Sequence, residues 1–298
     1  MTVRPVIVTG AGGFIGSHLA ERLISDGKEV RAIESNPRAV ESHLAAIADH
    51  PRFTVDERDV MDIAPHDPVF AGAAILYHCA GVSHTVLDPD IYWVANVGTF
   101  GRSLEAARVN GIGKVIYPSS AAVYGDGQWP AREDQPLQPR SAYGLSKKMT
   151  EEMADCWYRW YRIGSIGFRI FNGYGPRAES IGAVGSFLNK IREGKPICVT
   201  GDGSQRRDFV HVRDITDAFV LAAESSIRYG VYNLGTGKPH RIADLAALMG
   251  APVHFTPADQ ASPQDMWADI STLSRDLGFT PSVSLETGIA ELLKTIVG

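Results

Sequence analysis

The chain reads Val6-Ile7-Val8 and then Thr9-Gly10-Ala11-Gly12-Gly13-Phe14-Ile15-Gly16 close to its start. This order predicts a short buried strand that passes through a glycine turn into a helix. In such a turn Gly10 suits the tight bend, Gly13 lets phosphate groups approach the backbone, and Gly16 allows the helix to pack on the strand. The first N–H groups of the helix then point at an anion, which the helix dipole favours. Turns and helix caps also use glycine, but the apolar strand before the loop and the amphipathic run after it favour a dinucleotide-binding site.

The composition is that of an ordinary soluble protein, with 44% hydrophobic and 21% charged residues. A length of 298 residues suffices for one large domain or two. The formal net charge of −5 provides no basic field, so we expect neither nucleic acid nor an anionic membrane as a partner. Local arginine or lysine side chains must therefore hold any anionic small-molecule substrate.

The cysteines are too few and too scattered for a metal centre or a disulfide framework. Cys79, Cys156 and Cys198 lack metal-ligand spacing, and their number is odd. We therefore expect no metal, and a reducing compartment, the cytoplasm. Residues 1–8 read as part of a strand and not as a signal peptide. No run approaches the roughly 20 apolar residues of a membrane span.

The first two-thirds of the chain alternate between strand-like and helix-like segments. Apolar strand candidates occupy residues 6–9, 30–34, 53–55, 74–78, 115–119 and 166–170, and helical periodicity occupies residues 14–26, 38–49, 91–109 and 144–162. This alternation predicts an α/β fold with a Rossmann-type, doubly wound parallel sheet. We assign residues 1–171 to this dinucleotide-binding domain.

The pattern changes near Asn172, because Gly and Pro become frequent and the strands become shorter. Strand candidates at 197–200, 209–212, 231–234 and 253–256 alternate with helices at 214–225 and 242–249. We expect residues 172–298 to form mainly a smaller, partly interleaved substrate-binding region. Part of 209–240 is expected to return to the first domain.

The helix expected at 144–162 carries a stripe of Met149, Met153, Cys156 and Trp160. Such a stripe is more often packed into a core. A helix–helix seam between two subunits is the alternative.

An acidic residue ends the second expected strand. Glu34 lies 18 positions after Gly16, where a carboxylate can accept hydrogen bonds from the adenosine ribose hydroxyls and repel a 2′-phosphate. This favours NAD over NADP, although Arg38 lies close in sequence and weakens the discrimination. Asp59 and Val60 follow the third strand, where the carboxylate can meet the adenine amino group or act as an ordinary loop aspartate.

A tyrosine and a lysine four residues apart point to proton transfer. On a helix, Tyr143 and Lys147 share one face. A free phenol has a pKa of about 10 and is a poor base near neutral pH. A nearby ammonium and the positive charge of a nicotinamide both favour the phenolate and lower that pKa. Tyr143 can then take a proton from a substrate hydroxyl while a hydride leaves the same carbon.

Two serines end the fifth expected strand. Ser119 and Ser120 lie at the carboxyl end of the strand, which faces the ligand crevice in sheets of this kind. A serine hydroxyl there can donate and accept hydrogen bonds and so orient the reacting oxygen toward Tyr143. A turn or a helix cap is the ordinary use of serine at such a position.

Together these segments resemble the extended short-chain dehydrogenase/reductase family, in its NAD-dependent sugar-nucleotide epimerase/dehydratase branch. The resemblance covers nearly the whole chain. It includes the segments Tyr77-His78-Cys79-Ala80-Gly81, Asn96-Val97-Gly98-Thr99, Phe168-Arg169-Ile170-Phe171-Asn172, Gly201-Asp202-Gly203, Arg207-Asp208-Phe209 and Asn233-Leu234-Gly235-Thr236-Gly237.

The resemblance implies a role for each matching residue. The catalytic residues would be Ser120, Tyr143 and Lys147. The NAD site would be lined by Tyr143 and Lys147 together with Gly10, Gly13, Phe14, Ile15, Glu34, Asp59, Val60, Ala80, Asn96 and Ser119. The substrate nucleotide or diphosphate would contact Asn172, Arg207 and Asp265.

For two of the matching residues, the residue type and its position also suggest a role without the resemblance. Arg207 suits the diphosphate because a guanidinium binds phosphate through two hydrogen bonds, and a surface ion pair is its alternative. For His78 we expect a buried, hydrogen-bonded imidazole and neither a metal ligand nor an acid–base group.

Two alanines separate the chain from the dehydratases of this branch. Those enzymes carry an acidic pair after the catalytic hydroxyl residue, where this chain has Ala121 and Ala122. Without an acid to protonate a leaving hydroxyl, we do not expect 4,6-dehydration. The loop also lacks the cysteine of members that epimerise carbons 3 and 5.

Two further departures concern the substrate nucleotide. The segment 84–89 is shorter than the usual loop and lacks its arginine, and Ser262 stands where many relatives have a diphosphate-binding arginine. Losing one charge-assisted contact removes roughly 1.5–3 kcal/mol unless another cation replaces it. Candidate replacements are Arg177, Arg206 and Arg213. The alternative is a substrate with fewer phosphates, such as a sugar acid.

We therefore expect an NAD-dependent epimerase of a nucleotide sugar, acting at carbon 4, and, by the resemblance, a homodimer. The alternative is an NAD-dependent dehydrogenase of a sugar or sugar acid that releases NADH. A non-catalytic, NAD-sensing regulator is a third possibility, which the presence of both Tyr143 and Lys147 disfavours.

Overall fold

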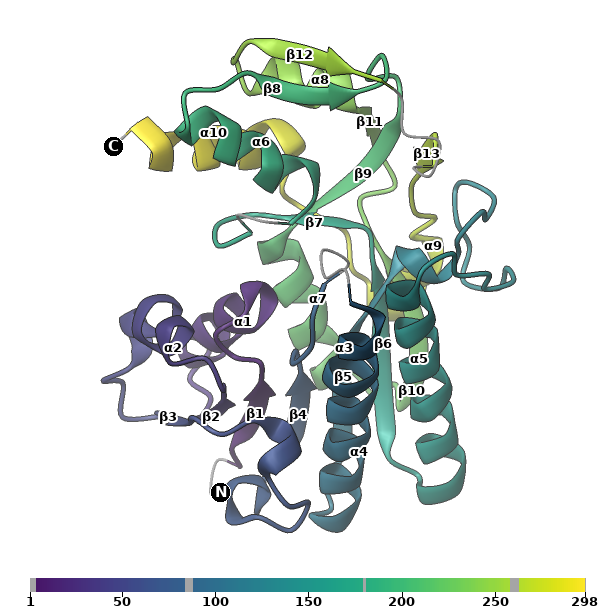
Figure 1. Ribbon diagram of the computed structural model, residues 1–298. Coiled ribbons are helices and arrows are strands. Elements are labelled where there is room, and N and C mark those ends of the chain that lie inside the picture. Colours follow the sequence, from purple (N-terminus) through teal and green to yellow (C-terminus); the bar gives the residue numbers. More distant parts are fainter. Residues whose placement is uncertain (1–3, 84–87, 179–180, 258–262, 298) are drawn as a thin grey trace. The chain divides into compact units, whose positions relative to one another are not determined.

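The computed structural model describes residues 4–83, 88–178, 181–257 and 263–297 (Figure 1). The chain divides into two compact units. The N-terminal unit comprises the chain up to residue 125 together with 139–169 and 216–232, and the C-terminal unit comprises 126–138, 170–215 and the chain from 233 onward. The return of 216–232 falls within the expected range 209–240, whereas the place of 126–138 differs from the expected division.

A seven-stranded sheet forms the centre of the N-terminal unit, in the order β10-β6-β5-β4-β1-β2-β3. Its strands are β1 (Val6–Thr9), β2 (Val30–Ile33), β3 (Phe53–Asp56), β4 (Ile75–His78), β5 (Lys114–Ser120), β6 (Gly164–Ile170) and β10 (Tyr229–Leu234). β1 pairs in parallel with both β2 and β4, with Val8 opposite Ala32 and Tyr77. The strand order reverses between β1 and β4, and ligands bind at the carboxyl ends of the strands beside such a reversal. The predicted Rossmann-type α/β fold is confirmed.

Helices flank this sheet. They are α1 (Phe14–Ser25), α2 (Pro37–His43), α3 (Pro89–Tyr92), α4 (Thr99–Val109), α5 (Ala142–Tyr161) and α7 (Val212–Glu224). The helices α4 and α5 run side by side and both contact β5 (Figure 1). The core that they help to cover includes Ile7, Phe100, Leu104 and Val115.

Two of the predicted helices are interrupted. The helix expected at 38–49 stops after α2, where the fully buried Leu44 turns inward, and resumes only as a 3-10 turn at Ala45–Ile47. The helix expected at 91–109 consists of α3, a π-helix at Trp93–Gly98 and then α4. π-helical turns are wider than α-helical ones and are frequent at functional sites. Here the π-helix contains Asn96, which is only 1% exposed.

The stripe on α5 does not form the core face of that helix. Trp160 is 76% exposed and Cys156 is exposed, and of the stripe Met153 packs partly buried against the core. The core-packing interpretation is therefore wrong for the outer part of the stripe. The buried face instead includes Gly144, which comes so close to the 3-10 turn after β5 (Ala121–Val123) that a Cβ there would lie 2.6 Å from the Ala122 carbonyl oxygen.

The C-terminal unit is built around β9 (Arg206–His211). This strand pairs antiparallel with β11 (Pro239–Arg241) and in parallel with β13 (Asp265–Met266) and β7 (Asn172–Tyr174). A separate parallel pair consists of β8 (Ile197–Thr200) and β12 (Val253–Thr256), both at the predicted bounds. The strand expected at 209–212 begins earlier, at Arg206, and Val212 already belongs to α7.

The helices of this unit are α6 (Gly182–Arg192), α8 (Ile242–Leu248), α9 (Ser271–Leu277) and α10 (Leu285–Val297). Its core includes Phe187, Ile197, Phe209, Leu245 and Ile289. Across the described ranges, no helix has the length and apolar character required to cross a membrane.

Candidate active site

The glycine loop packs directly against the end of β4. Gly10 has a φ of +62°, and a Cβ on it would lie 2.6 Å from the Ala80 Cα. A Cβ on Gly16 would lie 2.1 Å from the Gly10 carbonyl oxygen. Both positions therefore require glycine, Gly10 for its backbone conformation and Gly16 for the approach of α1 to the loop. Phe14 and Ile15 form the first turn of α1, directly after Gly13.

Glu34 lies next to this loop, immediately after β2, and is 9% exposed. Its Oε2 atom accepts a hydrogen bond from the Gly12 N–H at 2.8 Å, and its Oε1 atom accepts one from the Asn36 N–H at 2.9 Å. A carboxylate has about four acceptor positions, so these contacts leave capacity for ribose hydroxyls. The sequence analysis gave Gly12 no role, although its position among the loop glycines could have suggested one.

Asp59 and Val60 follow β3 as expected, at the start of a 3-10 turn. Asp59 Oδ1 caps this turn by accepting a hydrogen bond from the Met61 N–H at 2.8 Å. Val60 is 4% exposed and belongs to the core. Asp59 therefore has the ordinary capping role of a loop aspartate. The residue as a whole is exposed.

Asn96 joins the loop after β4 to helix α5. Its Oδ1 atom accepts a hydrogen bond from the Val82 N–H at 2.8 Å, and its Nδ2 atom donates to Ser146 Oγ at 3.0 Å. Ala80 is held in the same loop, because its N–H donates to Thr9 Oγ1 at 3.3 Å. These contacts place the loop after β4 beside the glycine loop.

The predicted catalytic residues come together at the start of α5. Ser141 Oγ caps this helix by accepting a hydrogen bond from the Gly144 N–H at 3.0 Å, which sets Tyr143 in the first turn. Ser120 is a neighbour of Tyr143 and lowers the pKa of its phenol through hydrogen bonding. Lys147 Nζ lies 5.9 Å from the centre of the Tyr143 ring and donates to the Pro118 carbonyl oxygen at 3.1 Å. Ser120 also accepts a hydrogen bond from the Ala122 N–H, the capping role given as its alternative.

The pKa values of these groups follow from burial. Burial raises the pKa of the Tyr143 phenol, the Ser120 hydrogen bond acts in the opposite direction, and the neighbouring Tyr92 adds to the rise. Burial also lowers the pKa of the Lys147 ammonium to about 8. The protein's own groups thus shift the Tyr143 pKa in the direction opposite to the expected one. The expected lowering included the charge of a nicotinamide, which is not part of the protein.

Ser119 has a partner that the sequence did not indicate. Its Oγ atom donates to Glu151 Oε1 at 2.5 Å, and Glu151 forms a buried ion pair with Arg169 at 2.8 Å. This carboxylate lies on the same face of α5 as Lys147, four residues earlier, and that spacing was the only signal in the sequence.

His78 is a buried imidazole, as expected. Its Nδ1 atom lies 2.9 Å from Ser103 Oγ and 3.1 Å from Thr9 Oγ1. Burial lowers the pKa of this imidazole to about 3. The ring is therefore neutral at physiological pH.

The predicted substrate residues gather around β9 in the C-terminal unit. Asn172 Nδ2 donates to the Asp208 carbonyl oxygen at 3.0 Å. The Arg207 guanidinium donates to the Pro263 carbonyl oxygen at 2.7 Å and to the Gln264 carbonyl oxygen at 3.2 Å. Burial lowers the pKa of Arg207.

Asp265 is engaged with a different arginine. It pairs with Arg206 at 2.7 Å, and the Arg206 guanidinium also lies 4.6 Å from the Trp267 ring. This ion pair holds the pKa of Asp265 below its ordinary value. Ser262 and the segment 84–87 lie outside the described residues.

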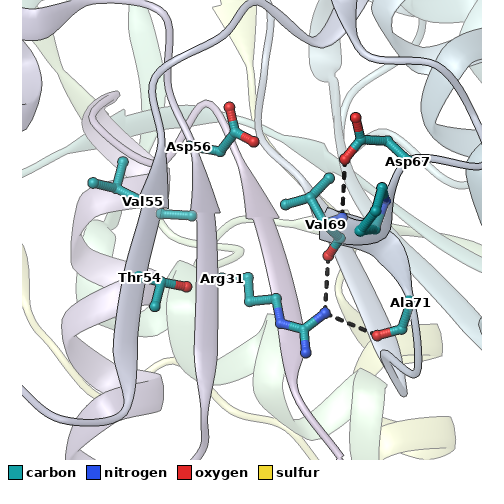
Figure 2. A pocket seen from close by; sticks show the side chains of 9 residues that line it. Arg31, Thr54, Val55, Asp56, Asp67, Val69 and Ala71 are labelled. Atoms are coloured by element: carbon teal, nitrogen blue, oxygen red, sulfur yellow. Dashed lines mark hydrogen bonds between the residues drawn. The ribbon is translucent and has the colours of Figure 1, made fainter.

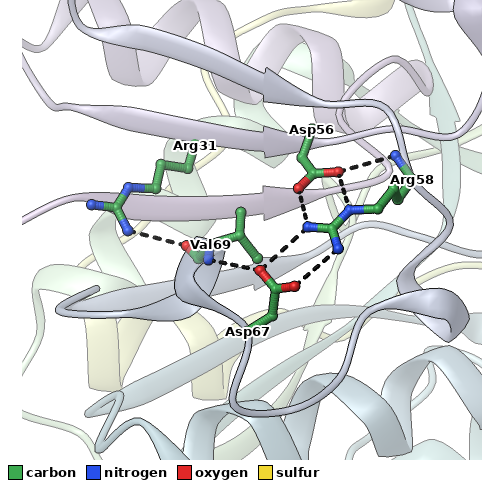
Figure 3. Close-up of polar contacts among 5 residues, drawn as sticks. All are labelled: Arg31, Asp56, Arg58, Asp67 and Val69. Atoms are coloured by element: carbon green, nitrogen blue, oxygen red, sulfur yellow. Dashed lines mark hydrogen bonds and ion pairs between the residues drawn. The ribbon is translucent and has the colours of Figure 1, made fainter.

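A pocket of about 460 Å³ opens elsewhere in the N-terminal unit, on β2 and β3 (Figure 2). None of its lining residues is a predicted site residue. Beside it, Arg58 donates to Asp56 at 2.5 Å and to Asp67 at 2.9 Å, while Arg31 donates to the Val69 carbonyl oxygen at 3.1 Å (Figure 3). Arg58 lowers the pKa of both aspartates, so the charges there are matched within the protein. The residues predicted for the cofactor and the reaction lie instead around the carboxyl ends of β1, β4 and β5.

Comparison with known proteins agrees with this geometry. Residues 6–235 match the model of the NAD dependent epimerase/dehydratase family. The chain is 32% identical over 310 residues to UDP-glucose 4-epimerase of Mycolicibacterium smegmatis, covering 97% of each chain. It is 31% identical over 308 residues to dTDP-glucose 4,6-dehydratase of Streptomyces griseus, covering 96% of this chain and 92% of that one.

A solved structure shows the same fold over the whole chain. UDP-glucuronic acid 4-epimerase from Bacillus cereus, in complex with UDP-glucuronic acid and NAD, matches with a TM-score of 0.91 at 26% identity, over 98% of this chain and 99% of that one. The resemblance inferred from the sequence is confirmed. The chain belongs to the NAD dependent epimerase/dehydratase family.

Proposed function

We propose that this chain is an NAD-dependent epimerase that inverts carbon 4 of a nucleotide sugar. The observation that carries the proposal is the grouping of Ser120, Tyr143 and Lys147, with Lys147 Nζ 5.9 Å from the centre of the Tyr143 ring and bound to the Pro118 carbonyl oxygen of the strand that ends at Ser120. The three groups lie at the carboxyl edge of the sheet that also bears the glycine loop. The relatives named as UDP-sugar 4-epimerases support this assignment.

The N-terminal unit fits NAD. Among the described residues, a Cβ on Gly13 would meet only the Gly10 carbonyl oxygen, at 3.2 Å, so the backbone at the start of α1 leaves room for a pyrophosphate. Glu34 would hold the adenosine ribose, and Asp59 and Val60 would flank the adenine. The remaining contacts would come from Gly10, Phe14, Ile15, Ala80, Asn96 and Ser119. When bound, NAD supplies a reversible hydride acceptor.

Tyr143 is the proposed acid and base. Its phenol oxygen would take the proton of the sugar 4-hydroxyl and later return a proton to the oxygen on carbon 4. Ser120 would hold that same oxygen, because its side chain is near enough to Tyr143 to act on the phenol's pKa. The buried Lys147 ammonium would favour the phenolate and hold the nicotinamide ribose. Inversion also requires the sugar to present either face while its nucleotide stays anchored.

The C-terminal unit would provide that anchor. Arg207 would bind the diphosphate, since a guanidinium fixed by backbone carbonyls keeps a defined orientation. Asn172 and Asp265 would contact the nucleotide around the same strand. With Ser262 in place of the usual arginine, Arg207 carries more of the affinity than in relatives that have both.

Dehydration is the chemistry of one relative, dTDP-glucose 4,6-dehydratase. The residues after Ser120 disfavour it here, because Ala121 and Ala122 offer methyl groups where dehydratases of the branch place acids. A net dehydrogenase would use Tyr143 and Lys147 in the same way, and it differs in releasing NADH.

We further propose that the protein is a homodimer joined through α4 and α5. Large apolar side chains remain exposed on these helices and the π-helix before them, with Trp160 at 76%, Val94 at 59% and Leu145 at 42%. Exposed apolar surface of this kind marks protein–protein contacts. We place the protein in the cytoplasm, because Cys79, Cys156 and Cys198 are free thiols.

The proposed function is tested by turnover with NAD on UDP-glucose, UDP-glucuronic acid and dTDP-glucose. We expect the 4-epimer to appear without accumulation of free NADH. Tyr143→Phe should lower kcat by about 10²–10⁴-fold with little change in Tm, since a positioned acid–base group contributes about that much. Tyr161→Phe, on the exposed end of the same helix, is the matched control.

Each alternative has its own outcome in this assay. Steady release of NADH would assign a dehydrogenase, and loss of water from the sugar would assign a dehydratase. NAD binding without turnover of any sugar or sugar acid would assign a regulator.

A further inference from the structure

A buried ion pair contacts the strand that carries the catalytic serine. The Glu151 and Arg169 side chains are each 7% exposed. Arg169 Nη2 lies 2.8 Å from Glu151 Oε2, and Arg169 Nε lies 3.0 Å from Glu151 Oε1. The same Oε1 atom accepts the Ser119 hydroxyl at 2.5 Å, and Arg169 Nη1 donates to Tyr124 Oη at 2.8 Å.

The pair touches both segments that supply catalytic groups. Glu151 lies on α5, four residues after Lys147 and eight after Tyr143, so the three side chains share one face of the helix. Ser119 directly precedes Ser120 at the end of β5. The Ser119–Glu151 hydrogen bond therefore joins the strand of the catalytic serine to the helix of the catalytic tyrosine.

Stability alone is a weak reason for such a pair. Withdrawing two charges from water is costly, and replacement of a buried ion pair by apolar side chains of similar volume is often neutral or stabilising. A carboxylate that accepts from a serine hydroxyl and from a guanidinium is directional, however. It fixes distance and orientation, and in a medium of low dielectric constant any displacement that breaks these bonds is strongly disfavoured.

We propose that Glu151 and Arg169 are positioning residues, which hold the end of β5 against α5 through Ser119 so that the Ser120 and Tyr143 hydroxyls stay hydrogen-bonded. This inference rests on the proposed function in taking Tyr143 as the acid–base group. Ser119 is the link in this arrangement, because it donates its hydroxyl hydrogen to Glu151 and directly precedes Ser120.

Loss of the pair has a signature that differs from simple unfolding. The Ser120 hydrogen bond opposes the rise that burial causes in the Tyr143 pKa. If the end of β5 moves away from α5, this hydrogen bond weakens and the Tyr143 pKa rises further. Proton transfer then slows, while the C-terminal unit still binds the nucleotide, so kcat falls and KM does not.

The test is the double variant Glu151→Met/Arg169→Met, which removes both charges together and leaves neither buried alone. We expect a Tm close to native, a kcat lowered by about 10- to 100-fold, and a KM within about twofold of native. The single variants Glu151→Gln and Arg169→Met strand one charge and should lower the Tm more than the double variant does. Ser119→Ala breaks the hydrogen bond between β5 and Glu151 and should also lower kcat.

Tyr117→Phe is the matched control. Its hydroxyl lies on β5, close to the same core, and has no hydrogen-bond partner among the described residues. Removing it should leave kcat and the ionisation of Tyr143 unchanged, and the Tm should be equal to the native value or higher, because a buried hydroxyl without a partner is destabilising.

The ionisation of Tyr143 gives a second readout that needs no substrate. The ultraviolet absorbance of each protein and of its Tyr143→Phe counterpart is followed as a function of pH, and the difference between the two curves reports the ionisation of Tyr143. We expect this ionisation to occur at higher pH in the double variant. A folded double variant with native kcat and native Tyr143 titration overturns the proposal. If the double variant fails to fold, Ser119→Ala breaks the same link and the same two readouts decide. If the native protein epimerises no sugar, the proposed function fails while the titration still decides on positioning.

Discussion

The Gly12 N–H donates a hydrogen bond of 2.8 Å to Glu34 Oε2. The contact joins the loop after β1 to the residue that follows β2. It depends on the absence of a side chain, because a Cβ on Gly12 would lie 2.6 Å from Ala39 Cβ and 3.0 Å from Glu34 Cγ. The phosphate-binding loop and the ribose-binding carboxylate of the proposed NAD site therefore form one unit.

Gly12→Ala should weaken NAD binding. The added methyl group displaces either the Glu34 carboxylate or the loop, and we expect the Kd for NAD to rise by about tenfold or more, equivalent to about 1.4 kcal/mol. Calorimetric titration with NAD measures this. Gly113→Ala is the control, since a Cβ there would meet the Ala74 carbonyl oxygen at an ordinary 3.6 Å. Equal NAD affinity of both variants would contradict the prediction.

Glu34→Ala should change the preference between cofactors. Removing a charge-assisted hydrogen bond to the ribose costs roughly 1.5–3 kcal/mol, or about 10- to 150-fold in NAD affinity. The repulsion of a 2′-phosphate disappears with the carboxylate, so affinity for NADP should fall less than affinity for NAD, or rise. Parallel titrations with NAD and NADP give the ratio. Glu41→Ala removes an exposed carboxylate from α2 and should leave that ratio alone, and an unchanged ratio in Glu34→Ala would count against the assigned role.

Lys147 should set an alkaline limit to activity. Burial lowers the pKa of its ammonium to about 8, so the charge is present below that pH and is lost as the pH rises through it. We expect kcat/KM, which reports the free enzyme, to decline above about that value because the phenolate of Tyr143 loses its neighbouring positive charge. Lys147→Arg keeps its charge and should move the decline to higher pH. A native profile that rises well beyond this pH would be inconsistent with the assignment.

His78 should make folding stability depend on pH below neutrality. Burial lowers its pKa from 6.5 to about 3, so between these values the unfolded chain binds a proton that the folded chain does not. The contribution of the neutral ring is complete above 6.5 and declines as the pH falls toward 3, by up to about 1.4 kcal/mol per pH unit. Urea unfolding at about pH 7 and about pH 5 should show this loss, and His78→Asn should show a smaller one. If the native protein and His78→Asn lose the same free energy of unfolding between these two pH values, the prediction is refuted.

The predictable part of the candidate site lies in short, continuous segments of the sequence. The glycine loop is a strand, a turn and a helix in direct succession, and the Tyr143–Lys147 pair is one helical turn, so local periodicity suffices for both. The same local logic placed β8 and β12 correctly. It was wrong for the outer part of the α5 stripe, where Trp160 is exposed, because the buried face of the helix instead includes Gly144, packed against the 3-10 turn after β5.

The rest depends on contacts between distant segments. Glu151 follows Lys147 by four residues and reads as an exposed helical charge until Arg169, 18 positions further on, is placed beside it in the folded chain. Burial likewise decides the direction of the Tyr143 pKa shift, and no spacing in the sequence reports burial of a phenol in the first turn of a helix. The sequence thus suggested the groups proposed to react, whereas the groups proposed to position them became visible only in the structure.

The helical segment formed by α3, the π-helix at Trp93–Gly98 and α4 should tolerate a change in length less well at the π-helix than at its C-terminal end. Tyr92, before it, lies 5.7 Å from the Tyr143 ring, and Asn96, inside it, reaches both Val82 and Ser146. Each α-helical residue turns the chain by about 100°, so gain or loss of one residue within this segment would rotate Asn96 away from both partners. At the far end of α4, Val109 is 45% exposed, so a change in length there displaces fewer buried contacts. Natural length variation in this helix is therefore expected to collect at its C-terminal end and to spare the six residues of the π-helix.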